Sequence, residues 1–128
     1  MKNLMILFLI VPALLSFTLG EDMTAITKAL NTGDATTLSK FFDSDVELSI
    51  LDNEDIYSKA EASKIVKTFF ADNATKSFAK AHSGQSKGND SQYVIGNLTT
   101  SVGAYRVYIY MKVSGKNYLI QELRIDKK

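Results

Sequence analysis

A single histidine and the absence of cysteine limit the acid–base and nucleophilic chemistry open to this chain of 128 residues. His82 is the one imidazole, and an imidazole suits a general base because it titrates near neutral pH. In a strand predicted at residues 78–83, His82 has the same parity as Phe78, so we expect it on the buried face of a sheet. A histidine that is structural, or simply exposed, is the alternative.

Acidic residues flank another predicted strand and could attract a hard cation such as Ca²⁺. A calcium loop of the EF-hand type needs alternating oxygen ligands, a glycine at its sixth position and a distal glutamate. Neither acidic cluster follows that pattern, and with one histidine and no cysteine a zinc site would need carboxylates that the spacing does not supply. We therefore predict solvated turns, with no metal and no cofactor. The acidic residues are Asp43, Asp45, Glu47, Asp52, Glu54 and Asp55.

Aromatic and cationic side chains alternate with largely apolar ones in the strand predicted at residues 104–113. Successive side chains of a strand point to opposite faces, so one face should be core and the other exposed. Tyrosine and arginine are favoured at interaction hot spots, so the exposed stripe could bind a protein partner, a glycan or a second copy of the chain. Packing between neighbouring strands, with no partner, is the alternative. This candidate interface comprises Arg106, Tyr108, Tyr110 and Lys112.

Three helices are predicted ahead of the main sheet. Asp22 is placed to cap the first, which Gly33 should end, and Asp34 to cap the second, whose apolar stripe continues to residue 42. Ser58 and Glu61 have the spacing of a capping box, so the third helix should begin there. Its wide apolar face makes it the principal core helix.

Strands with period-two alternation make up the remainder of the domain. A strand at residues 46–50 should form a sheet edge between the second and third helices, and the acidic residues after it should break it. Four later strands, joined by hairpin turns, predict an antiparallel meander. Helices followed by a meander indicate an α+β domain whose sheet curls around a helical layer. The four strands are expected at residues 78–83, 92–100, 104–113 and 118–125.

The chain also resembles a bacterial domain family of unknown function that has the nuclear transport factor 2-like, cone-shaped fold. The resemblance implies three N-terminal helices packed on a strongly curved, mainly antiparallel sheet. The wider fold includes isomerases, dehydratases and epoxide hydrolases as well as noncatalytic binding and dimerisation modules, so it selects no chemistry. The similar segments are ALNTGDATTLSKFFDSDVELSI at Ala29–Ile50, YSKAEA at Tyr57–Ala62, YRVYIYMK at Tyr105–Lys112 and YLIQELRI at Tyr118–Ile125.

The resemblance further implies a pocket between the sheet and the helices. The residues predicted to face it are almost all apolar; Tyr105 and Gln121 are the polar exceptions and, with His82, the candidate pocket residues. Our leading hypothesis is a noncatalytic module that binds a small apolar ligand or a protein partner, with homodimerisation through the tyrosine stripe. The alternative is an isomerase- or hydrolase-like enzyme that uses Tyr105 and His82.

The N-terminal segment predicts export. Lys2 precedes an apolar run at residues 4–15, which is too short to span a bilayer but long enough for a signal peptide. Thr18 and Gly20 are small residues suited to cleavage before Glu21; an uncleaved anchor is the alternative. We expect residues 1–20 to be a signal peptide and residues 21–128 to be one domain, periplasmic or secreted, with no stable membrane anchor after cleavage.

Charge is unevenly distributed over the predicted mature domain. Acids dominate from Glu21 to Asp55 and bases dominate from Ile56 onward, while the two nearly balance over the whole chain. A balanced chain has no general attraction to nucleic acid, so we predict no nucleic-acid partner. We expect the two parts to complement each other within the fold.

Overall fold

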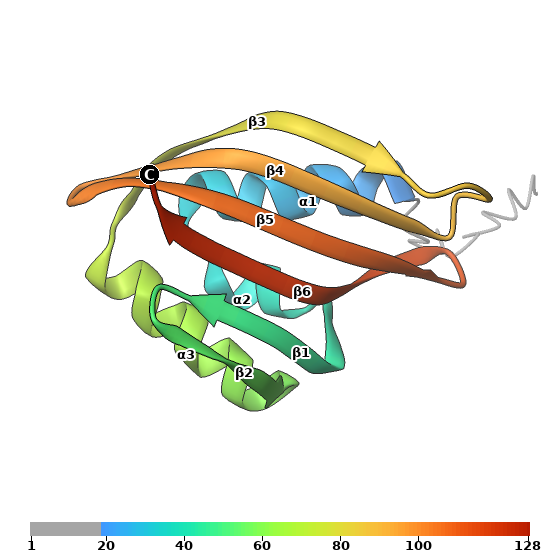
Figure 1. Cartoon of the computed structure of the whole chain (residues 1–128), viewed down its shortest axis with the longest axis horizontal. Helices are drawn as coiled ribbons and strands as arrows, with labels where there is room; N and C mark the ends of the chain where they lie inside the picture. The colour runs from blue at the N-terminus through green and yellow to red at the C-terminus, as the bar shows by residue number, and fades with distance from the viewer. Residues whose placement is uncertain (1–18) are drawn as a thin grey trace, which may run out of the picture.

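The computed structural model describes residues 19–128, in which three helices lie behind one face of a six-stranded sheet (Figure 1). The predicted signal peptide, apart from Leu19 and Gly20, lies outside the described residues. No helix of residues 19–128 is long and apolar enough to cross a membrane. The helices are α1 (Leu19–Thr32), α2 (Ala35–Ser39) and α3 (Lys59–Asp72). The strands are β1 (Phe42–Ile50), β2 (Asn53–Ser58), β3 (Thr75–Gln85), β4 (Ser91–Thr100), β5 (Gly103–Ser114) and β6 (Asn117–Lys127).

The sheet has the order β2-β1-β6-β5-β4-β3, with β1 and β6 parallel and all other neighbours antiparallel. The α+β class and the four-strand meander are confirmed. The prediction that the strand around residues 46–50 forms the edge is wrong, because β2 pairs outside it. The acidic residues of β2 suggested a strand break, but an exposed edge strand can carry charged side chains without burying them.

For the first two helices, two predicted ends are confirmed and two are corrected. Gly33 ends α1 with a φ of 68°, and Asp34 caps α2 by accepting a hydrogen bond from Thr37 N at 3.0 Å. However, α1 begins at Leu19, so Asp22 is not its cap. The second helix ends at Ser39, because the following phenylalanines lead into β1 rather than completing a helical stripe.

Asp22 instead connects the first helix to the last strand. Its side chain is 2% exposed, and its Oδ2 accepts a hydrogen bond from Tyr118 N at 3.0 Å. A buried carboxylate needs such a partner, since an unsatisfied one would lose its hydration without compensation. This bond fixes the start of α1 against β6.

The core lies between the helices and the inner face of the sheet. Along β5 the inward residues are buried and their neighbours are more exposed, which confirms the predicted alternation. On α3 the buried residues face the same core, and Ser58 Oγ caps this helix by accepting from Glu61 N at 3.3 Å. The inward residues of β5 are Tyr105, Val107, Ile109 and Met111, and those of α3 are Ala62, Val66, Phe69 and Phe70.

Candidate interaction surface on the outer face of the sheet

The three candidate pocket residues do not come together in the structure. His82 is exposed and pairs with Ile95 on the outer face of the sheet. The predicted shared face with Phe78 is wrong because β3 has a register shift between residues 80 and 82, and an extra residue inverts the parity beyond it. Gln121 lies at a similar shift in β6, where its Nε2 donates to Asp43 Oδ2 at 3.3 Å.

Tyr105 faces the core, as predicted, but its polar and aromatic groups are both occupied. Its hydroxyl donates to Asn73 Oδ1 at 2.8 Å, and its ring meets the Phe69 ring edge-on, with the centroids 5.3 Å apart. The side chain is 6% exposed and belongs to one continuous apolar cluster. Tyr105 therefore joins α3 to β5, at a distance from His82 on the opposite face of the sheet.

The candidate interface lies on the outer face of the sheet, as its alternation predicted. Arg106 and Lys112 are exposed, and Tyr108 and Tyr110 are half-buried between neighbouring strands. All three helices of the described chain lie on the opposite side of the sheet (Figure 1). The stripe is thus open to solvent in a single copy of residues 19–128.

A shallow hollow of about 480 Å³ lies at the centre of this outer face. Tyr93 of β4 stacks on Tyr108 beside it, with the ring centroids 6.4 Å apart and an interplanar angle of 23°. Aromatic faces with nearby guanidinium groups are common in the centre of protein interfaces. The hollow is lined by Ile95, Arg106, Tyr108, Glu122, Arg124 and Asp126.

Partial burial and neighbouring acids set the electrostatics of the hollow. Burial raises the pKa of Glu122, and the carboxylate of Glu47, its register partner on β1, raises it further. Arg124 opposes this effect, since its Nη1 lies 3.8 Å from Glu122 Oε1. The pKa of the Tyr108 phenol is also raised, first by burial and then by Glu122, so this hydroxyl stays protonated as a hydrogen-bond donor.

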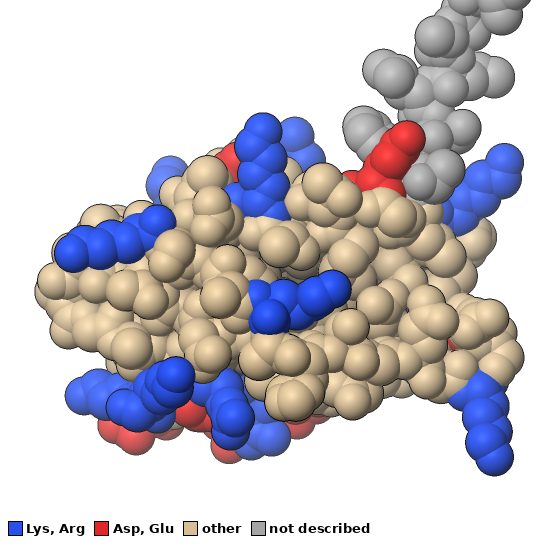
Figure 2. Space-filling view, turned by 90° about the horizontal axis from the view of Figure 1, so that it is seen from above, with Lys and Arg blue, Asp and Glu red and all other residues tan. Residues whose placement is uncertain are grey.

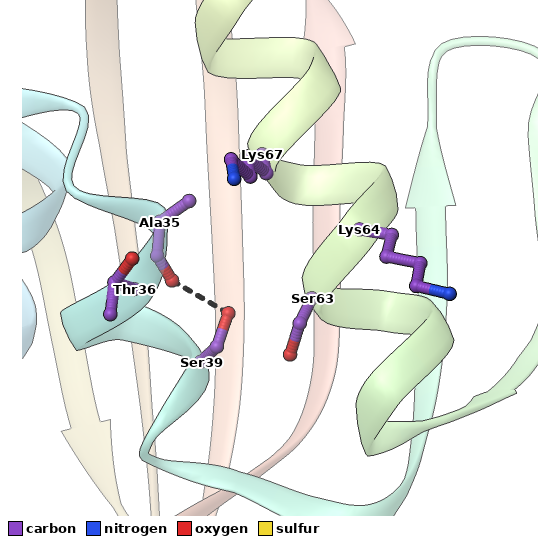
Figure 3. Close-up of a pocket in the computed structure, with 6 residues that line it drawn as sticks. All are labelled: Ala35, Thr36, Ser39, Ser63, Lys64 and Lys67. Atoms are coloured by element: carbon purple, nitrogen blue, oxygen red, sulfur yellow. Dashed lines mark hydrogen bonds between the residues drawn. The ribbon is translucent and has the colours of Figure 1, made fainter.

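A second hollow, between α2 and α3, has little capacity for chemistry (Figure 3). The Ser39 hydroxyl donates to Ala35 O at 2.6 Å, and the Ser63 hydroxyl donates to Lys59 O at 2.6 Å. Lys67 extends toward α2, and the residues drawn include no carboxylate or imidazole. Across residues 19–128, no three histidine, aspartate or glutamate side chains form a group that could hold a metal ion.

Several residues of the outer face were not singled out from the sequence. Tyr93 and Ile95 come from β4 and Glu122 from β6, on either side of the predicted stripe. A strand is predicted at residues 92–100, but its residues gave no sign that Tyr93 would stack on Tyr108. That contact depends on the pairing register of β4 with β5, where Tyr93 opposes Tyr110 and Ile95 opposes Tyr108.

Comparisons with known proteins agree with this architecture. The model of a domain of unknown function, DUF4783, matches residues 23–126. The chain is similar to a DUF4783 family protein from Bacteroides ovatus, with 31% identity, a TM-score of 0.76 and coverage of 81% of this chain and 93% of that one. For a family protein from Bacteroides uniformis the values are 28%, 0.77, 82% and 95%.

More distant structures support the fold alone. An NTF2-like protein of unknown function from Cytophaga hutchinsonii has 8% identity and a TM-score of 0.60, over 88% of this chain and 94% of that one. No curated protein matches the chain.

Proposed function

Because the chain belongs to the DUF4783 family of domains of unknown function and has the NTF2-like fold, we propose a function from its own surface: it is an exported, noncatalytic interaction module. Its outer sheet face binds a protein partner, in the simplest case a second copy of the chain. Export is supported by the apolar N-terminal segment, and the binding role by the open aromatic face.

The single observation that carries this proposal is the uncovered Tyr93–Tyr108 stack beside the arginine-lined hollow. Tyr93 of β4 is 38% exposed. Ile56 of β2 lies on the same face of the sheet and is 68% exposed. Large exposed apolar and aromatic groups that share one face favour association, because burying them removes apolar surface from water. Arginine and acidic residues in the same hollow offer both partners of an ion pair across a twofold interface.

The same geometry argues against the other hypotheses for this domain. A small apolar ligand that contacts Tyr105 would have to displace Phe69 or Asn73, which already contact it. The neighbouring hollow of about 390 Å³ is lined by Phe69 and Asn73 but not by Tyr105. The enzyme alternative would need His82 and Tyr105 in one pocket, and the sheet separates them. Association through the outer face requires neither a cavity nor a rearrangement of the core.

The test is the mass of the protein in solution and in complexes purified from its own host, measured by native mass spectrometry. We expect a dimer or a stable partner complex that the double substitution Tyr108→Ala and Tyr110→Ala dissociates. Val102→Ala, at an exposed turn residue away from the hollow, is the matched control and should leave the mass unchanged. A protein that is monomeric and unpartnered in every form would rule out the proposal.

A further inference from the structure

We propose that the groove between α1 and the edge strand β3 binds an acidic, extended segment of a protein partner, which adds to the sheet as a seventh strand. The groove measures about 420 Å³ and is separate from the outer-face hollow. Its volume lies in the usual range of ligand clefts. Residues from α1 form one wall, and Phe78 and Lys80 of β3 form the other.

The backbone of β3 is available for pairing on this side. β3 is the last strand of the sheet, and Phe78 N donates to Asn31 Oδ1 at 2.9 Å, so this N–H points away from β4. Outward-pointing groups recur at every second residue of a regular edge strand, and the register shift of β3 comes only after Lys80, so the N–H and C=O of Lys80 also point outward. Within residues 19–128, no group outside β4 bonds to the Lys80 backbone. Asn31 thus occupies one pairing position and leaves the next one open.

The charge of the groove defines the occupant as acidic. Lys28 and Lys80 stand on its two walls, and in the described part of the chain neither forms an ion pair. β3 contains lysines but no acidic residue. Seen from the β3 side, the middle of the molecule carries blue basic side chains with no red acidic ones among them (Figure 2). An acidic strand would therefore be attracted, and a basic one repelled.

The remaining lining favours apolar side chains between the acids. Phe78 and Met23 supply apolar surface, and the hydroxyls of Thr24 and Thr27 donate to carbonyl groups of their own helix. These hydroxyls therefore do not compete for the backbone of an added strand. Strand addition presents alternate side chains to one face, so a segment in which acids alternate with small apolar residues matches the groove.

The test uses nuclear magnetic resonance on the ¹⁵N-labelled protein, expressed as the full chain and purified as the cell processes it. The probe is a blocked peptide in which glutamate alternates with valine. We expect amide shifts centred on Lys80 and on the α1 residues of the groove. The double substitution Lys28→Glu and Lys80→Glu should weaken binding by about fivefold or more, as expected for two surface ion pairs. Lys64→Glu with Lys116→Glu makes the same change of net charge elsewhere and should leave binding unchanged.

Two further peptides separate strand addition from simple charge attraction. One replaces glutamate by lysine, and the other keeps the composition but groups the glutamates at one end. The proposal fails if either binds as well as the alternating acidic peptide, if the shifts centre on the outer face of β5, or if no shift occurs at millimolar peptide. It also fails if the protein self-associates and Lys80→Glu alone abolishes that association, because the occupant would then be a second copy.

Discussion

Replacement of Asp22 by alanine should lower the free energy of unfolding by about 2 to 3 kcal/mol. Asp22 is 2% exposed, and its carboxylate accepts a hydrogen bond from Tyr118 N. Tyr118 is itself only 4% exposed. Hydrogen bonds to charged groups contribute about 1.5 to 3 kcal/mol, and the substitution leaves a buried N–H without an acceptor. The packing of α1 on β6 loses its polar contact at the same time.

Urea unfolding followed by circular dichroism measures this loss, and the melting temperature should fall by about 10 °C in parallel. Asp22→Asn retains an acceptor oxygen, so its free energy of unfolding should fall by less than that of the alanine variant. Lys28→Ala, at an exposed position on the same helix, should change stability by less than about 0.5 kcal/mol. If Asp22→Ala were as stable as Lys28→Ala, the carboxylate would not hold α1 to the sheet.

Three further predictions test the core, the edge strand and the outer face. Tyr105→Phe should lower the free energy of unfolding by about 1 kcal/mol, because Asn73 Oδ1 loses its donor; an unchanged urea midpoint would contradict this. Gly96→Ala should cost about 1 to 3 kcal/mol in the same assay, since the added Cβ would lie 2.3 Å from the Phe78 ring and 2.7 Å from Ala79 O; full stability would mean that β3 shifts freely. Glu122→Gln should flatten the pH dependence of stability: a raised pKa in the folded state favours folding at low pH and opposes it as pH rises through that value. Relative to the wild type, the free energy of unfolding of the variant should therefore increase between the ordinary pKa of a glutamate and neutral pH. If the difference in free energy of unfolding between variant and wild type is the same at pH 4 and at pH 7, burial and Glu47 do not raise the pKa of Glu122.

The alternation along β5 was enough to predict which of its residues are buried, because every inward position is apolar or aromatic and the pattern continues without interruption. Helix capping by Asp34 and Ser58 was equally predictable, because it depends only on one side chain and one nearby backbone N–H. These features depend on local geometry alone. These features account for the starts of α2 and α3 and for the central meander.

The position of His82 could not be predicted in the same way. A bulge depends on how two strands pair, and the register shift near residue 81 has no signature in the residues of β3 themselves. The pairing of Gln121 with Asp43 has the same origin, since it follows a shift in β6. Candidate sites built from strand parity therefore fail at the first unpredicted bulge.

The partition of charge along the chain has its counterpart at the two edges of the sheet. The acidic part supplies Glu54 and Asp55 to β2, and the basic part supplies Lys76 and Lys80 to β3, so the two sets lie at opposite ends of the strand order. If two copies met through their β2 edges, carboxylates would face carboxylates, and if they met through their β3 edges, lysine ammonium groups would face each other. The expected complementarity within one molecule thus gives way to repulsion between two molecules that meet by the same edge, and this repulsion protects the sheet from twofold pairing of β2 with β2 or of β3 with β3. Because added salt screens such exposed charges, this protection should weaken as ionic strength rises.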